Sequence, residues 1–207
     1  MAERMIKFNI QNVKYALPDE DGSYSAATVK PLGGAANLSL ERQFSEQEIY
    51  EDGQITYVLP SDKGINGTLG LVTIEDQYEI DMGRKMVLAN GIADVQQNGS
   101  QHHAIYFESK GTTKKTQPIV LKTWLLNVTS TAPTEAYEQT TENANPQTHS
   151  MNLNVLGDLI MASDGLVVYK DKNGNTKKAW KISSHPGLEG YDTFHTTVPV
   201  PKVTVGA

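Results

Sequence analysis

The sequence predicts a mainly β fold with one short helix, because apolar and polar residues alternate in several segments and tight-turn dipeptides lie between them. The alternation is clearest over residues 36–44 and 150–155, and it has the period of two that a half-buried strand requires. Asp-Gly and Asn-Gly pairs, which favour two-residue hairpin turns, occur at 21–22, 52–53, 90–91, 98–99, 164–165 and 173–174. We therefore expect antiparallel strands joined by hairpins.

Size and composition restrict the possible functions. A chain of 207 residues suits a single domain over 1–207 and can bury about 70% of its unfolded surface. With 18 Lys and Arg against 24 Asp and Glu, the chain lacks the basic excess of a protein that grips nucleic-acid phosphates. It has no cysteine, which excludes thiolate catalysis and cysteine-ligated zinc. No signal-peptide pattern or membrane-length apolar run is present, so we expect a cytosol-like compartment and no membrane.

An opening strand or pair of strands is expected at residues 5–10 and 12–17, and another strand at 26–32, with the turn at Asp21-Gly22 between them. In the next strand, 36–44, the apolar side chains are Leu38, Leu40 and Phe44. Arg42 interrupts this apolar face, and we expect it to lie at the edge of the face. The opposite face carries Asn37, Ser39, Glu41 and Gln43.

A polar and acidic excursion follows at residues 45–61 and turns back at Asp52-Gly53, which predicts a long β-hairpin. Gly64, Gly67 and Gly70 then bracket a strand with the sequence T-L-G-L-V-T. Glycine within a strand often marks a bend or the close approach of another backbone.

Residues 73–83 predict one short helix. Thr73 and Asp76 have the spacing of a capping box, and Gly83 can end a helix in the left-handed conformation. Apolar side chains recur every four positions, at Ile74, Tyr78 and Met82. Further strands are expected near 92–95 and 103–108.

The stretch from 118 to 157 organises the C-terminal half. Both of its ends predict strands, and in the second one Met151, Leu153 and Val155 alternate with Ser150, Asn152 and Asn154. The connector between the two strands, 130–147, is too long for a hairpin turn and carries Glu135, Glu138 and Glu142 without an opposing Lys or Arg. We interpret it as a solvent-facing or partner-facing arm.

The last fifty residues predict a meander and a tail. Strands are expected at 159–163, 166–170 and 178–182, joined by the two turn dipeptides at 164–165 and 173–174. Residues 185–207 contain three prolines, which predicts an extended C-terminal arm or a linker.

No residue pattern points to catalysis, to a cofactor or to a metal site. His102 and His103 are adjacent, so on a strand they would point to opposite faces and could not share one ion. The loop that starts at Asp171 lacks the glycine and glutamate of a calcium-binding loop, and no nucleotide-binding or nucleophile motif is present. We therefore expect a non-enzymatic protein without cofactor, whose arms find partners in neighbouring subunits.

Several segments together carry a family resemblance over most of residues 5–158. They are I-K-F-N-I-Q-N-V-K-Y-A-L, G-G-A-A-N-L-S-L-E with the hairpin after it, N-G-T-L-G-L-V-T-I-E-D, T-W-L-L-N-V-T-S-T-A-P and S-M-N-L-N-V. In order and spacing they resemble the major tail proteins, or tail-tube proteins, of long-tailed phages with non-contractile tails, especially those of Gram-positive hosts.

This resemblance implies a β-sandwich or half-barrel flanked by one helix, with subunits that form hexameric rings stacked into a tube. It further implies assembly in the host cytoplasm, a place in the virion tail, and a tape-measure protein, tail terminator and distal tail protein as partners. Many relatives carry a C-terminal immunoglobulin-like domain, which we do not expect in this chain. The inter-subunit arms implied by the resemblance contain Glu46, Glu48, Tyr50, Asp52, Gly53, Tyr57, Glu135, Glu138 and Glu142.

The polar strand faces predict the wall of the channel. If they face a lumen, the wall is neutral to acidic and lacks basic side chains, so DNA would pass without specific binding. The residues expected there are Asn37, Ser39, Glu41, Gln43, Thr68, Asn152 and Asn154.

Two alternatives remain open at the level of sequence. One is a monomeric β-sandwich adhesion or carbohydrate-binding module, with Trp124 or Trp180 as the platform for a sugar ring. The other is the tube protein of a contractile tail or of a phage-derived secretion device, which shares the expected fold.

Overall fold

The computed structural model describes residues 6–112, 118–135, 148–162 and 165–203. The strands are β1 (Ile6–Ala16), β2 (Val29–Glu51), β3 (Gln54–Ile74), β4 (Lys85–Leu88), β5 (Gly91–Asp94), β6 (His103–Thr112), β7 (Ile119–Ser130), β8 (His149–Val155), β9 (Asp158–Leu159), β10 (Lys178–Ala179) and β11 (Lys181–Ser184). The helices are a 3-10 turn (Ala26–Thr28) and α1 (Asp76–Asp81).

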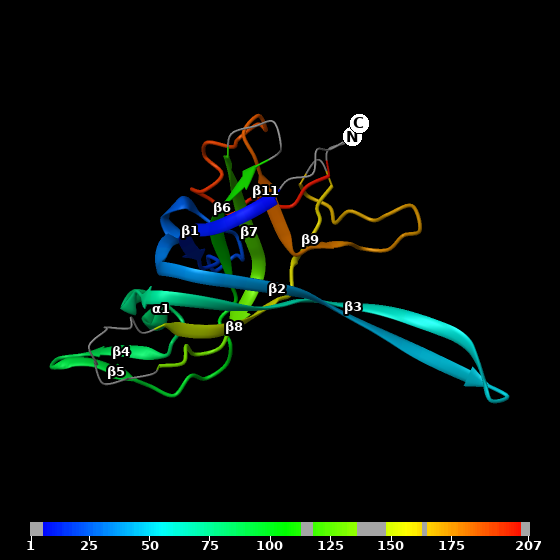
Figure 1. Ribbon diagram of the computed structural model, residues 1–207, viewed down its shortest axis with the longest axis horizontal. Coiled ribbons are helices and arrows are strands. Elements are labelled where there is room, and N and C mark those ends of the chain that lie inside the picture. Colours follow the sequence, from blue (N-terminus) through cyan, green and yellow to red (C-terminus); the bar gives the residue numbers. More distant parts are fainter. Residues whose placement is uncertain (1–5, 113–117, 136–147, 163–164, 204–207) are drawn as a thin grey trace.

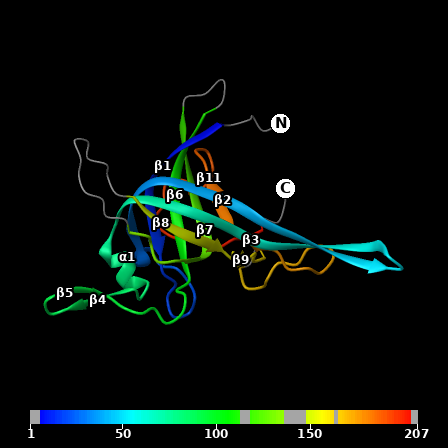
Figure 2. The same cartoon turned by 60° about the horizontal axis from the view of Figure 1, so that its bottom comes forward.

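The centre of the molecule is an antiparallel sheet with the strand order β11-β7-β6-β1-β2-β3-β8. β7 also pairs with β8, through Val128 opposite Val155, so the strands from β7 to β8 close into a barrel (Figure 1). The predicted mainly β fold is confirmed, and the expected half-barrel is closed. The long β2–β3 hairpin leaves the barrel at one end, and the β4–β5 hairpin lies at the opposite end in both views (Figures 1 and 2).

Every second residue of a barrel strand points inward, and these apolar side chains fill the barrel interior. In β8, Met151, Leu153 and Val155 are buried, while Asn152 and Asn154 are exposed. The interior cluster also takes in Tyr15, Leu69, Leu71, Leu125 and Val128, together with Tyr78 and Met82 from the α1 region. The barrel wall therefore has an apolar inner face, as the period of two predicts.

β7 is buried on both faces. Leu125 and Val128 point into the barrel, whereas Trp124 and Leu126 join a second cluster with Val198 on the outside. Asn127 adopts a left-handed conformation with φ 51°, which allows the alternation to shift between Leu126 and Val128. A strand that is covered on both faces typically has a continuous run of apolar residues in its sequence.

The C-terminal segment supplies the outer cover of β7. The indole N–H of Trp124 donates to the Phe194 carbonyl at 2.7 Å, and the Lys122 ammonium donates to the Tyr191 carbonyl at 2.8 Å. Met161 N–H donates to the Pro201 carbonyl at 2.8 Å. The segment over 185–207 for which an extended arm was expected thus includes Phe194 and Val198, which pack against the outer face of the barrel.

The predicted meander is only partly regular. Met161 bridges to Val168 and Lys170 to Thr176, as hairpins require, but β9 pairs with β10 and thereby joins the first segment to the third. The last segment then turns away, and β11 adds to the barrel sheet beside β7. Beyond Ala179, the third meander segment therefore pairs with β7 and no longer with the other meander segments.

Helix α1 confirms the predicted apolar stripe but not the predicted cap. Thr73 lies within β3, and the N-cap is Glu75, which makes no side-chain cap hydrogen bond. Tyr78 and Met82 are buried, and Gly83 has φ 71°. The prediction that Phe44 lies on the packed apolar face of its strand is wrong, because 58% of its surface is exposed where the strand leaves the barrel.

A buried polar chain anchors the α1 region to the barrel. Arg84 pairs with Glu79 at 3.1 Å and donates to the Ser130 hydroxyl at 2.9 Å. Ser130 lies 2.8 Å from the Tyr78 hydroxyl, which in turn lies 3.2 Å from Nε2 of His103. Because Nδ1 of His103 faces the Gln101 carbonyl at 3.1 Å, that nitrogen carries the proton and Nε2 accepts from Tyr78. The hydroxyls of Ser130 and Tyr78 and the imidazole N–H of His103 then each have an acceptor.

The buried position of His103 in this hydrogen-bond network predicts that the protein loses stability in mild acid. Burial lowers the pKa of His103 to about 4, below its value of 6.5 in the unfolded chain. The unfolded state therefore binds more protons than the folded state between these two pH values. As the pH is lowered from 6.5 towards 4, the free energy of unfolding decreases by on the order of 3 kcal/mol. Urea titrations of wild type and His103→Gln from pH 7.5 to 4.5 test this, and the variant should show the flatter profile. Parallel profiles would contradict the assignment.

The glycines of β3 predict a graded response to added side chains. A Cβ at Gly67 would lie 2.5 Å from the Ser39 carbonyl oxygen, which belongs to the backbone, whereas one at Gly70 would meet only the Asn37 side-chain amide. We expect Gly67→Ala to lower the free energy of unfolding by about 1–3 kcal/mol and Gly70→Ala to cost less, because an amide can rotate away. Urea denaturation measures both, and equal losses would contradict the close approach.

Candidate functional site

A polar face covers the outside of the barrel over β2, β3 and β8. Its residues lie in register rows, with Ser39 opposite Thr68 and Thr68 opposite Asn152. The next row consists of Glu41, Asn66, Asn154 and Thr129, each paired with the next on the neighbouring strand. Because the barrel interior takes the alternate residues of the same strands, the polar face is the direct complement of the apolar core.

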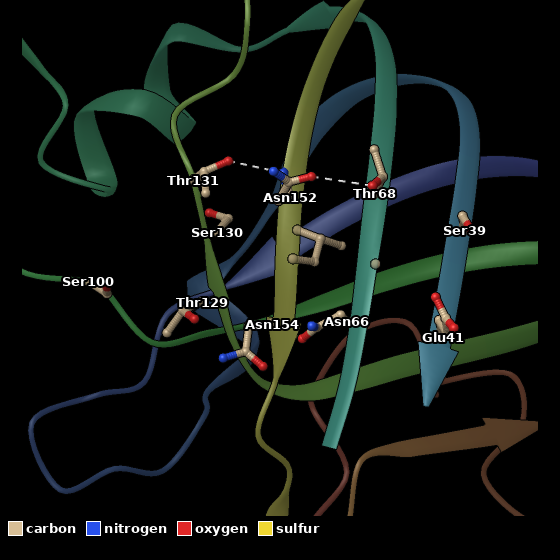
Figure 3. A pocket seen from close by; sticks show the side chains of 12 residues that line it. Ser39, Glu41, Asn66, Thr68, Ser100, Thr129, Ser130, Thr131, Asn152 and Asn154 are labelled. Carbon is tan, nitrogen blue, oxygen red and sulfur yellow. Dashed lines mark hydrogen bonds between the residues drawn. The ribbon is translucent and has the colours of Figure 1, made fainter. Parts of the chain in front are cut away.

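Short polar side chains on this face bind one another. The Thr68 hydroxyl donates to the Asn152 amide oxygen at 3.3 Å, and the Asn152 backbone N–H donates to the Thr131 hydroxyl at 3.0 Å. Figure 3 shows these groups side by side, with Glu41 at the margin. They line an open depression of about 550 Å³ together with Ser39, Glu41, Asn66, Gly67, Ser100, Thr129, Ser130, Leu153 and Asn154. Glu41 is the one formally charged residue among those lining groups.

The structure brings together most of the residues predicted for the channel wall. Five of the seven line the depression, namely Ser39, Glu41, Thr68, Asn152 and Asn154. Asn37 lies in the adjacent row beside Gly70, and Gln43 pairs with Gly64 where the ladder leaves the barrel. Asn66, Thr129 and Thr131 were missed, although the period of two in β3 would have placed Asn66 beside Thr68.

The second candidate surface is the arm, which we define as residues 43–64 of the β2–β3 hairpin. Beyond Ile65, which pairs with Val155, β3 has no partner in β8, so the two strands of the arm pair only with each other. At roughly 3.3 Å per residue the arm is about 30 Å long. The predicted tip is confirmed, because Asp52 and Gly53 both have positive φ, at 51° and 77°.

The arm combines exposed apolar side chains with carboxylates. Ile49 lies opposite Tyr57, and Tyr50 lies opposite Ile55. Tyr50 is 60% exposed and Tyr57 is 59% exposed. Phe44, Ile49, Ile55, Val58 and Leu59 are exposed as well. The predicted arm residues Glu46, Glu48, Tyr50, Asp52, Gly53 and Tyr57 all lie on this ribbon.

The acidic connector is only partly described. Glu135 is exposed and follows β7, whereas Glu138 and Glu142 lie outside the described residues. Glu135 borders a depression together with Glu79, Arg84 and His149 near the α1 region, away from the arm.

A basic cleft lies at the base of the arm. Arg42 forms an ion pair with Asp62 across the ladder, and its guanidinium lies 4.5 Å from the centre of the Trp180 ring. The hydrogen bond from Arg42 lowers the pKa of the Asp62 carboxyl. The cleft has a volume of about 510 Å³ and is lined by Arg42, Asp62, Lys63, Gly64, Leu156, Thr176, Lys177, Lys178 and Trp180.

The described residues show neither a metal-ligand cluster nor a membrane-spanning helix. Within residues 6–112, 118–135, 148–162 and 165–203, no three His, Asp or Glu side chains cluster closely enough to hold a metal ion. No helix in the described ranges is long and apolar enough to span a membrane.

Comparison with known proteins yields a structural neighbour of low similarity. No protein-family model and no curated protein sequence matches the chain. Among solved structures, one similar chain belongs to the cryo-EM structure of the anti-feeding prophage (AFP) baseplate, 6-fold symmetrised. The TM-score is 0.35 and the identity 10%, over 74% of this chain and 89% of that chain.

Proposed function

We propose that this protein is a structural subunit of a phage tail or a phage-derived tube, and that it assembles into stacked hexameric rings rather than acting as an enzyme. The observation that carries the proposal is the arm. Its two strands project about 30 Å from the barrel, and they expose seven large apolar side chains that no part of the described chain covers. The sequence resemblance to tail-tube proteins supplies the kind of assembly.

The exposed arm argues for self-association on physical grounds. Single apolar residues on a surface are ordinary, but a contiguous set on a projecting ribbon marks an interaction site. A two-stranded ribbon on its own is only marginally stable in water, and its outer edges present unpaired backbone groups. A neighbouring copy would cover both the side chains and the edges.

The polar face suits the wall of a channel for DNA. Its side chains are short and neutral apart from Glu41, so a phosphate backbone would find no cation to bind and would be weakly repelled. In such a tube, a tape-measure protein would occupy the lumen before DNA, and a tail terminator and a distal tail protein would cap the ends.

The carbohydrate-binding alternative fits the structure less well. Trp124 is fully buried and its indole N–H is bonded to the Phe194 carbonyl. Trp180 is partly buried against the core, and the Arg42 guanidinium lies over its ring. Trp124 therefore offers no face on which a sugar could stack, and one face of the Trp180 ring is already occupied by the guanidinium.

A contractile tail or a secretion device would use the same tube, so the choice between these systems concerns the outside of the tube. A sheath protein would have to bind there. Co-sedimentation of assembled tubes with the sheath protein of a neighbouring gene, where one exists, would distinguish a contractile system from a non-contractile one.

Shortening the arm should abolish assembly and leave the barrel folded. In the test variant an Asn-Gly turn replaces residues 45–61, so that Phe44 and Asp62, which are cross-strand partners, become the ends of the hairpin. We expect a monomer whose urea midpoint is close to that of the wild type, while the wild type forms tubes at high concentration. Sedimentation velocity and negative-stain images measure this, and tubes from the shortened chain would contradict the proposal.

Adding cations to the polar face should make tubes hold DNA. Glu41→Lys with Gln43→Lys should still assemble, but genome ejection should slow or stop, and purified tubes should bind DNA with an affinity that falls as salt is raised. The matched control is Glu41→Gln with Gln43→Asn, which removes charge without adding a cation. Normal ejection through tubes with both lysines would show that this face does not line the channel.

A further inference from the structure

We infer that the acidic tip of one copy's arm docks in the basic cleft at the base of a second copy's arm. The inference rests on the proposed function and names the contact that would join the subunits. The acidic tip comprises Glu48, Glu51 and Asp52, and all three are exposed. The cleft is the one lined by Arg42, Lys63, Lys177 and Lys178 around Trp180.

The charges of the two surfaces are complementary. From Phe44 to Ser61 the arm contains four carboxylates, at Glu46, Glu48, Glu51 and Asp52, and no Lys or Arg. The cleft presents four cationic side chains, of which Arg42 pairs with Asp62 and Lys177 with Asp171, so Lys63 and Lys178 have no ion pair among the described residues. The segment behind it adds Lys170, Lys172 and Lys181, all exposed and all without an ion pair among the described residues. An acidic segment is the chemistry that such a cleft recognises.

A copy cannot bring its own tip into its own cleft. Glu51 lies opposite Gln54, and Gly64 lies in the cleft, ten residues farther along β3. A continuous antiparallel ladder holds these points about 33 Å apart. The attraction can therefore be satisfied only between copies.

The apolar side chains of the arm fit the same arrangement. Leu156 and the Trp180 ring lie in the cleft, and Tyr50 and Ile55 form a cross-strand pair next to the acidic tip. A tip that enters the cleft would remove these apolar groups from water while its carboxylates meet the lysines at the rim. The contact joins different surfaces of two copies, so it repeats from copy to copy and can build a ring or a filament.

Charge reversal tests the pairing. The tip variant carries Glu48→Lys and Glu51→Lys, and the cleft variant carries Lys63→Glu and Lys178→Glu; all four side chains are exposed. Each variant alone should associate at least tenfold more weakly than the wild type. An equimolar mixture should recover association, because each reversed surface then meets its complement on the other variant. The control Glu20→Lys with Glu189→Lys reverses two exposed carboxylates of the body and should assemble normally.

Sedimentation velocity at low and high salt separates the outcomes. Assembly of either reversed variant at the wild-type level overturns the inference and leaves the tube proposal standing. Failure of the mixture also overturns it, since the two surfaces would then act independently. A wild type that stays monomeric at every concentration overturns the proposed function together with the inference. Recovery in the mixture, lost at high salt, supports the pairing.

A cross-link gives an independent measurement. The chain has no natural cysteine, so Glu51→Cys with Lys178→Cys introduces the only thiols. The two positions are too far apart within one copy to form a disulfide, which requires Cα atoms within about 7 Å. Oxidation of assembled protein should give a ladder of covalent oligomers, whereas Glu51→Cys alone should give dimers at most. Absence of the ladder from assembled double-cysteine protein would overturn the inference.

Discussion

The β2–β3 ladder is longer than the barrel that it helps to build, and much of the molecule follows from this mismatch. β3 has 21 residues, whereas its neighbour β8 has 7. The barrel can therefore support only the part of the ladder that ends near Ile65, and the remainder projects as the arm. Continuity with the barrel and the Arg42–Asp62 ion pair hold the base of the arm, but nothing described in the chain covers its faces. The arm is stable in isolation only at its root, so its outer part is suited to a partner.

The barrel wall also has two unlike outer sides. Over β7 the C-terminal segment covers an apolar surface that includes Trp124 and Leu126, and it satisfies the indole N–H. Over β2, β3 and β8 no such cover is needed, because the outward residues are Ser, Thr, Asn and Glu41. An apolar outer face had to be buried within the chain, whereas a polar one could remain open. The open side is therefore the side on which a water-filled channel is physically possible.

Local pattern predicted the parts of the fold whose causes are local. The alternation in β8 and in residues 37–41 gave the polar and apolar faces correctly, and Asp52-Gly53 gave the tip of the arm. The cover over β7 could not be predicted in this way, because Tyr191, Phe194 and Val198 contact β7 from about 70 positions away in the chain. The closing pair of β7 and β8 is likewise set by the whole barrel, and the connector between these strands carries no signal for it.

In the assembly that we propose, the number of subunits in a ring depends on the angle between the arm and the barrel. The charges of tip and cleft select the partner, but they do not fix that angle, since attraction between exposed charges is weakly directional. The backbone fixes it instead. The β2–β3 register shifts between Gln43 and Phe44, where the arm leaves the barrel, and again between Ile49 and Tyr50, next to the tip. Each bulge bends the ribbon and increases its twist, so these two sites would determine whether the repeated contact closes into a ring or continues as a helix.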